Sequence, residues 1–360
     1  MALKILYCGL QHENYNPKRG LSFEYNNFYL PMKRLEGVDV IEHPFDRILE
    51  VGKKKFNEEL LAVVLKEKPD LLFAFMYTDE FDRDILLKIR NETDTKTIAW
   101  FADDYWRFFN YSRHWAHYFG WAVTTYSRAM PWYRDEGIEN IILSQWGVDT
   151  EIYKPIDIPK DIEVSFVGQY KPGREKLLRF LGHQGIKVEA FGYGWPARLN
   201  GSSRSGGPNG KVSQEGMLKI FSRSRINLNL TARPGLFSPR VLARIFMRKS
   251  INKLVPDLHI LDNFRAYLHF PTPHTHARPF ELSGCRAFVI SGYSEDIGKS
   301  YRENEEMVFY RSSEELLERT EYYLKHDEER ERIAARGYER TLREHTYERR
   351  FRDIFQKICL

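Results

Sequence analysis

Residues 162–168 read Ile-Glu-Val-Ser-Phe-Val-Gly, a short apolar run that ends at a glycine. Such a run, followed by a helical pattern at 174–181, is typical of a buried strand in a parallel sheet. The same rhythm continues with strand-like runs at 188–191, 226–230 and 287–290. Strands that alternate with helices predict a sheet covered by helices on both faces. This stretch decides the fold because it begins a second series of alternating strands and helices, after a first series in residues 1–150.

An equivalent series of apolar runs precedes residue 150. The runs lie at 3–8, 38–41, 71–75, 97–101, 121–124 and 141–144. We therefore predict two doubly wound α/β domains, residues 1–150 and 151–343, each with a Rossmann-like parallel sheet. The join lies where glycine, aspartate and proline interrupt the pattern, at 147–159. Residues 344–360 are expected to form a last helix, with apolar side chains three and four positions apart.

The composition narrows the class of protein. The chain has 360 residues, with 55 Lys and Arg against 50 Asp and Glu, so its formal net charge is +5. A nucleic-acid-binding protein usually carries a larger, clustered excess, so no nucleic acid is expected as a partner. The three cysteines form no CxxC pair, which argues against a zinc ribbon or a disulfide framework. No apolar run suits a signal peptide or approaches the roughly 20 residues that cross a bilayer, so we expect a cytoplasmic protein.

Short motifs follow one another in a fixed order along nearly the whole chain. They lie at 68–72, 100–108, 124–127, 146–149, 166–168, 191–195, 224–230, 278–281, 306–310 and 345–351. Taken together, they resemble the CgeB-like (spore-maturation protein-like) glycosyltransferases. The resemblance implies a GT-B fold, with two Rossmann-like domains facing across a cleft and the helix at 344–360 crossing back to the first domain. It also implies transfer of a sugar from a nucleotide-diphosphate donor to an acceptor that the sequence does not name.

In the second domain, the resemblance implies a donor site around Glu281. This residue matches the glutamate that binds the ribose hydroxyls in related GT-B enzymes, and a carboxylate can accept hydrogen bonds from two vicinal hydroxyls. An acid stabilised at a helix N-terminus is the alternative. Arg278 resembles an arginine that faces the donor diphosphate, a role that suits a bidentate guanidinium. Eight residues before Glu281, where the family has another glutamate, this chain has Pro273. That departure leaves the sugar and the stereochemical outcome open.

Four further positions are candidates for donor contacts. Arg174 follows the loop that begins at Gly168 and opens a predicted helix, whose N-terminus could bind phosphate oxygens. An ordinary surface arginine is the alternative. Gly192 and Tyr193 end a strand, where a glycine lets the backbone approach a ligand closely and an aromatic ring can stack on a base or sugar. A tight turn with a packed tyrosine explains the same residues.

In the first domain, three residues are candidate general bases. Asp103 and Asp104 follow a strand, at the sheet edge where ligands bind in open α/β folds. His12 follows the first strand, and a solvated histidine is the alternative. A base is needed only if the reaction inverts the sugar, because a same-face retaining mechanism needs none. The adjacent aspartates do not form an Asp-x-Asp motif, so we expect no metal and no cofactor besides the nucleotide-sugar donor.

Residues 236–269 interrupt the second domain with mixed basic and apolar residues, and we interpret them as an insertion into that domain. Four interpretations stay open: a solvated basic loop, an acceptor-binding element, a helix at a membrane surface and a homodimer contact. The activity has alternatives too. One is a non-catalytic nucleotide- or sugar-binding protein of GT-B fold, and the other is an epimerase of that fold.

Overall fold

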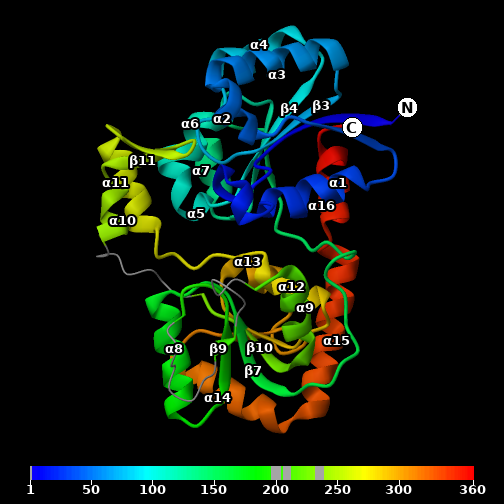
Figure 1. The fold of residues 1–360 in the computed structure, drawn as a ribbon, viewed down its shortest axis with the longest axis vertical. Helices are drawn as coiled ribbons and strands as arrows, with labels where there is room; N and C mark the ends of the chain where they lie inside the picture. Colours follow the sequence, from blue (N-terminus) through cyan, green and yellow to red (C-terminus); the bar gives the residue numbers. More distant parts are fainter. Residues whose placement is uncertain (1, 196–203, 206–211, 232–238) are drawn as a thin grey trace. The chain divides into compact units, whose positions relative to one another are not determined.

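The computed structural model describes residues 2–195, 204–205, 212–231 and 239–360. The chain divides into two compact units (Figure 1). Unit 1 comprises residues 1–145, 236–270 and 347–360, and unit 2 comprises residues 146–235 and 271–346. Each unit contains one six-stranded parallel sheet. The predicted α/β class, with two Rossmann-like sheets, is therefore confirmed.

The sheet of unit 1 has the strand order β2-β1-β3-β4-β5-β6. Its strands are β1 (Leu3–Cys8), β2 (Val38–Glu42), β3 (Leu71–Phe75), β4 (Lys96–Phe101), β5 (Trp121–Thr124) and β6 (Ile141–Leu143). Every residue of β3 is buried, as expected for a central parallel strand with both faces covered. After β1 the chain first adds β2 on one side and then β3 on the other. The strand order therefore reverses between β1 and β3, and such a reversal opens a crevice for ligands at the carboxyl edge.

Helices cover the unit 1 sheet. They are α1 (Leu30–Lys33), α2 (Ile48–Val51), α3 (Lys53–Glu67), α4 (Arg83–Glu92), α5 (Asp104–Arg107), α6 (Arg113–Ala116), α7 (Ala129–Asp135) and the last helix, α16 (Tyr347–Lys357). Asp82 caps α4, because its carboxylate accepts a hydrogen bond of 2.9 Å from the backbone N–H of Asp84. On α16, Tyr347 and Phe351 pack against the ring of Phe28, with centroids 5.1 and 5.6 Å away. The apolar face of the last helix thus completes the core of unit 1.

The sheet of unit 2 has the strand order β14-β13-β10-β7-β8-β9. Its strands are β7 (Ile162–Val167), β8 (Val188–Phe191), β9 (Arg204–Ser205), β10 (Ser224–Asn229), β13 (Val289–Gly292) and β14 (Val308–Tyr310). Its helices are α8 (Pro172–His183), α9 (Gln214–Arg223), α12 (Arg278–Gly284), α13 (Glu295–Ser300), α14 (Ser313–Lys325) and α15 (Asp327–Glu344). The chain leaves β7 on one side for β8 and later returns on its other side as β10. The order of unit 2 therefore reverses between β7 and β10.

The two faces of the unit 2 sheet are chemically different. Apolar side chains of β7, β8 and β10 pack with α8 and α14 in one core. Polar side chains alternate with them and point to the other face, where Asn227 donates to the carbonyl of Phe221 and Asn229 donates to the Ser291 hydroxyl. Both amides are buried and bonded within the sheet layer, which supports a structural role for them.

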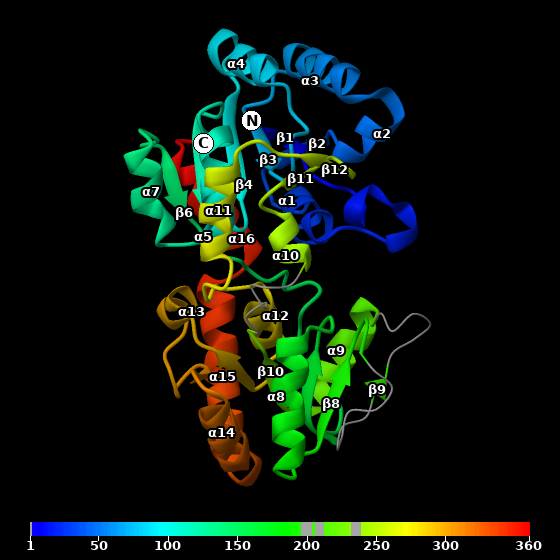
Figure 2. The same cartoon turned by 90° about the vertical axis from the view of Figure 1, so that its left-hand side faces the viewer.

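The insertion folds as part of unit 1, which corrects the prediction that it belongs to the second domain. It comprises α10 (Pro239–Ala243), the antiparallel strands β11 (Met247–Ser250) and β12 (Lys253–Pro256), and α11 (Ile260–His269). Figure 2 shows α11 beside α5. Asp262 forms an ion pair of 3.0 Å with Arg113, and Asn263 accepts a hydrogen bond of 2.8 Å from Asn110. These polar contacts hold the insertion on unit 1. They could not be predicted from the position of the insertion in the sequence, which lies between elements of unit 2.

Candidate functional site

The reversal point of unit 2 is occupied by an arginine. Arg174, on the first turn of α8, donates from Nε to the carbonyl of Leu230 at the end of β10 (3.2 Å) and from Nη1 to the carbonyl of Gln169 after β7 (2.9 Å). Its guanidinium lies over the Phe166 ring, 5.2 Å from the centroid. Burial, and then repulsion from Arg278, lower the pKa of Arg174 to about 10. The charge is therefore fixed at the carboxyl edge, between the two strands where the order reverses.

Glu281 and Arg278 form an ion pair on α12. Nη1 of Arg278 lies 2.7 Å from Oε2 of Glu281, and the glutamate side chain is only 6% exposed. The guanidinium of Arg278 also lies over the Phe221 ring, 5.2 Å from its centroid. The pair places a guanidinium counter-charge beside the buried carboxylate. The two residues predicted to bind the donor are therefore in direct contact.

Positive charge accumulates around this pair. His276 has a pKa held well below its ordinary value by burial first, and then by repulsion from His274, Arg174, Lys171 and Arg278. A histidine that stays neutral among cations indicates a field of one sign. Such a field attracts anions, and a diphosphate carries the required charge. The structure therefore brings Arg174, Arg278 and Glu281 into one electropositive neighbourhood of unit 2.

The two glycines predicted near the donor pack against each other. Gly192 has φ +123°, and a Cβ there would lie 2.6 Å from the carbonyl oxygen of Gly168. No other residue fits this contact without a shift of the backbone. Trp195 donates from its indole nitrogen to the same carbonyl at 2.8 Å. Tyr193 is 58% exposed, so its ring is free of the core that surrounds Gly192.

In unit 1, His12 follows β1 along the chain, and β1 is one of the two strands between which the strand order reverses. Its Nδ1 lies 2.9 Å from Oδ1 of Asp46, and the same carboxylate accepts hydrogen bonds from the backbone N–H groups of Gln11 and His12. A carboxylate is an acceptor only, so the hydrogen bond at Nδ1 uses the N–H of the ring. Asp46 thus fixes the orientation of the His12 ring. The sequence prediction did not include Asp46, because it follows a different strand of the sheet.

The two aspartates after β4 have different surroundings. Asp104 is fully buried and accepts a hydrogen bond of 2.8 Å from the Tyr133 hydroxyl. Burial raises its pKa to about 6. These surroundings fit a packing role. They correct the prediction that Asp104 is a base, because a substrate hydroxyl cannot reach a fully buried carboxylate. Asp103 lines an open cavity of unit 1 and therefore stays a candidate general base.

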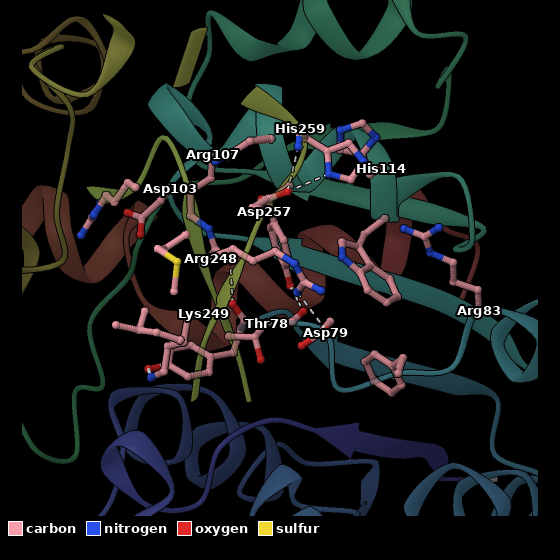
Figure 3. Close-up of a pocket in the computed structure, with 18 of the residues that line it drawn as sticks. Thr78, Asp79, Arg83, Asp103, Arg107, His114, Arg248, Lys249, Asp257 and His259 are labelled. Atoms are coloured by element: carbon pink, nitrogen blue, oxygen red, sulfur yellow. Dashed lines mark hydrogen bonds and ion pairs between the residues drawn. The ribbon is translucent and has the colours of Figure 1, made fainter. Parts of the chain in front are cut away.

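That cavity has a volume of about 930 Å³ and lies at the carboxyl edge of the unit 1 sheet (Figure 3). Its walls come from the segments that follow β3 and β4 and from the insertion. Among the residues that the structure describes, no group of three or more His, Cys, Asp or Glu is placed to hold a metal ion. No helix in the described ranges is both long and apolar enough to pass through a membrane.

The sequence prediction missed most of the polar residues in this cavity. Arg107 lies within the motif at 100–108, and Arg244 and Lys249 are basic residues of the insertion, but the sequence assigned no role to any of the three. The one available signal was the interleaving of arginine with aromatic residues at 105–108. Their convergence depends on the docking of the insertion on unit 1, which no local pattern encodes.

Comparisons with known proteins agree with this architecture. Residues 258–356, which include α12, match a protein-family model described as "Glycosyl transferase-like". A search of curated proteins gave no match. Among solved structures, the chain is similar to sucrose-phosphate synthase from Thermosynechococcus elongatus, with a TM-score of 0.62 and 10% identity, over 98% of this chain and 97% of that one.

Two further structures have the same fold. Anabaena HepE in complex with UDP gives a TM-score of 0.59 with 10% identity, over 99% of both chains. A putative UDP-N-acetylglucosamine 2-epimerase from Listeria monocytogenes gives 0.57 with 9% identity, over 99% of this chain and 96% of that one. The predicted GT-B fold is confirmed by these matches over nearly the full length. The predicted glycosyltransferase class agrees with the family match at 258–356.

Proposed function

We propose that this chain transfers a sugar from a nucleotide-diphosphate donor, bound by unit 2, to an acceptor bound by unit 1. The observation that carries the proposal is the Arg278–Glu281 pair beside Arg174, at the carboxyl edge of the unit 2 sheet. Glu281 accepts hydrogen bonds from the two ribose hydroxyls, and the arginines bind the diphosphate. The match of 258–356 to a glycosyltransferase-like family supports the same assignment, because the segment contains this pair.

The chemistry requires one bond to form and one to break. The acceptor hydroxyl oxygen bonds to the anomeric carbon, while the bond from that carbon to the diphosphate oxygen breaks. The leaving diphosphate gains negative charge, which the fixed guanidinium groups of Arg174 and Arg278 stabilise. In an inverting reaction the acceptor proton passes to Nε2 of His12, whose tautomer Asp46 fixes. In a retaining reaction the proton passes to the leaving phosphate oxygen.

The test is a panel of nucleotide sugars, assayed for release of the nucleoside diphosphate and for a rise in melting temperature. We expect one donor to raise the melting temperature, because a ligand of the native state stabilises it. Glu281→Ala should abolish that rise and the release of the nucleotide. Glu306→Ala is the matched control, since Glu306 is also buried and paired with an arginine, Arg302 at 2.8 Å, but precedes β14 at the opposite edge of the sheet. An unchanged donor response in Glu281→Ala would remove the proposal.

Two alternatives give different results in the same assay. Pro273 stands where the resemblance implies a glutamate that contacts the sugar, so a protein that binds a nucleotide or sugar without turning it over stays an alternative. Such a protein would show the thermal response without release of nucleotide. An epimerase, the activity named for the Listeria neighbour, would change the sugar in the absence of any acceptor.

A further inference from the structure

The cavity of unit 1 has a basic wall built by two distant parts of the chain. Arg107 comes from α5, while Arg244 and Lys249 come from the insertion. Figure 3 shows the side chains of Asp103, Arg107 and Lys249 directed toward the same space. A volume of about 930 Å³ lies within the range of pockets that enclose small organic ligands. The cavity is therefore large enough for a sugar-sized acceptor with a substituent.

Each of these three cations lies over an aromatic ring. The guanidinium of Arg107 is 3.9 Å from the Tyr111 centroid, that of Arg244 is 4.7 Å from the Trp106 centroid, and Nζ of Lys249 is 4.5 Å from the Tyr77 centroid. A ring face attracts a cation and restricts where its long side chain can lie. The stacking thus positions three positive charges without neutralising any of them.

The charges have no carboxylate partner at ion-pair distance within the part of the chain that the structure describes. Arg107 donates to the carbonyl of Tyr77 (2.7 Å), and Lys249 donates to the Tyr77 hydroxyl (2.6 Å) and to Asn14 (2.8 Å). All of these acceptors are neutral. Elsewhere in the cavity, Asp79 pairs with Arg248 at 3.0 Å, and Asp257 lies 2.8 Å from Nδ1 of His259. The unbalanced positive charge is therefore local to one side of the cavity.

This arrangement has an electrostatic cost that an anion would remove. Burial lowers the pKa of both Arg244 and Lys249, and repulsion from Arg107 lowers them further. Tyr105 and Asp103 oppose this shift of the pKa for Arg244, and Glu80 opposes it for Lys249, but neither carboxylate lies at ion-pair distance from the cation in the described structure. Like charges held close together in a partly desolvated site are most stable when a ligand supplies the opposite charge.

We propose that the cavity binds an acceptor through a phosphate group, which Arg107, Arg244 and Lys249 contact together. A phosphate offers several oxygens to converging donors, whereas a single carboxylate cannot satisfy three cations. The rings of Trp106 and Tyr111 provide apolar walls for the remainder of the ligand. The insertion thus serves as the acceptor-binding element and contributes two of the three contacts. The role of this ligand as the sugar acceptor rests on the proposed function, whereas the binding of its phosphate group does not.

The experiment measures binding of three probes to the full chain by titration calorimetry: inorganic phosphate, glucose 6-phosphate and unphosphorylated glucose. Phosphatidylcholine vesicles with and without phosphatidic acid form a second arm, which separates a lipid-borne phosphate from a soluble one. We expect glucose 6-phosphate or the phosphatidic-acid vesicles to bind, and the corresponding probe without a phosphomonoester, glucose or pure phosphatidylcholine vesicles, not to bind. A wild-type protein that binds no phosphate probe, or binds glucose equally well, would overturn the proposal.

The variants locate the site. Arg244→Gln/Lys249→Met should weaken phosphate binding at least about tenfold, since each charge-assisted hydrogen bond contributes about 1.5–3 kcal/mol. The matched control is Lys253→Gln/Arg265→Gln, which removes two exposed cations of the same insertion that do not line the cavity. Arg244→Gln alone is the second variant, because no hydrogen bond of the described structure depends on that guanidinium. Equal binding by the cavity variants and the control would contradict the assignment.

A third set of variants separates this inference from the proposed function. Arg278→Gln in unit 2 should weaken UDP binding and leave the phosphate probes bound to unit 1. Arg244→Gln/Lys249→Met should do the reverse. If no nucleoside diphosphate or nucleotide sugar of the panel binds while the phosphate probe binds, the donor assignment fails and the cavity assignment stands.

Discussion

Each unit has a six-stranded parallel sheet whose strand order reverses once, and the two units differ in the chemistry at that reversal. In unit 2, Arg174 lies between β7 and β10, and it is joined by the Arg278–Glu281 pair. In unit 1, the strand that borders the reversal leads to His12, oriented by Asp46. One edge carries arginines beside a buried glutamate, and the other carries a histidine whose ring is oriented by an aspartate. The comparison teaches that the fold supplies the place, whereas the partner of each side chain decides what that place can do.

The largest effect should come from the base of unit 1. His12→Gln keeps a hydrogen-bonding side chain but cannot take a proton at neutral pH, so we expect kcat to fall about 10²- to 10⁴-fold in an inverting reaction. Asp46→Asn should give a smaller loss, because it disturbs the tautomer of His12 without removing the ring. Steady-state kinetics at saturating donor and acceptor measure both. Full activity of His12→Gln would assign unit 1 a binding role only and would favour the retaining route.

The contrast between the units also shows how far the sequence alone reaches. Most strands of both sheets could be predicted, because short apolar runs ending at glycine or aspartate mark them directly, as at Phe166-Val167-Gly168. The two-residue strand β9 (Arg204–Ser205) has no such run and was not predicted. Glu281 and Arg278 were predicted from the resemblance to a family motif, and their spacing of three residues on one helix explains why their side chains are in contact. Local patterns therefore capture a site built within one helix.

Other parts of the sites depend on contacts between distant segments. The pairing of His12 with Asp46 and the stacking of Arg244 on Trp106 join elements that no periodicity relates. Asp103 and Asp104 are adjacent in sequence, yet only Asp104 is sealed beneath Tyr133. Neighbouring residues on a new helix point in different directions, so burial separates them once the helices pack. The insertion was assigned to the wrong unit for the same reason, since its ion pair to Arg113 is a tertiary contact.

A smaller effect should follow from the buried acid of unit 1. The pKa of Asp104 is raised by burial from 3.8 to about 6, so between these values the native state binds more protons than the unfolded state. The contribution of Asp104 to the free energy of unfolding should therefore decrease by about 3 kcal/mol as the pH rises from about 3 to about 7. Asp104→Asn should lack this component. The measurement is urea unfolding at several pH values, compared between the two proteins. An identical pH dependence would show that Asp104 is not titrating in this range.

The smallest of the three effects tests the ion pair of unit 2 against the unpaired cations of unit 1. Arg278→Met removes the counter-charge of Glu281, whose side chain is 6% exposed, and leaves a buried carboxylate alone. Breaking a fully buried pair costs several kcal/mol, and because Arg278 is about a quarter exposed we expect a loss of about 2 kcal/mol. Arg244→Met keeps the apolar stem over Trp106 and removes a charge that repels Arg107, so stability should change by less than about 1 kcal/mol. Chemical unfolding of both variants gives the comparison directly. If Arg244→Met were the more destabilising of the two, the cation over Trp106 would be a structural element of unit 1, and its assignment as a charge held ready for an anion would fail.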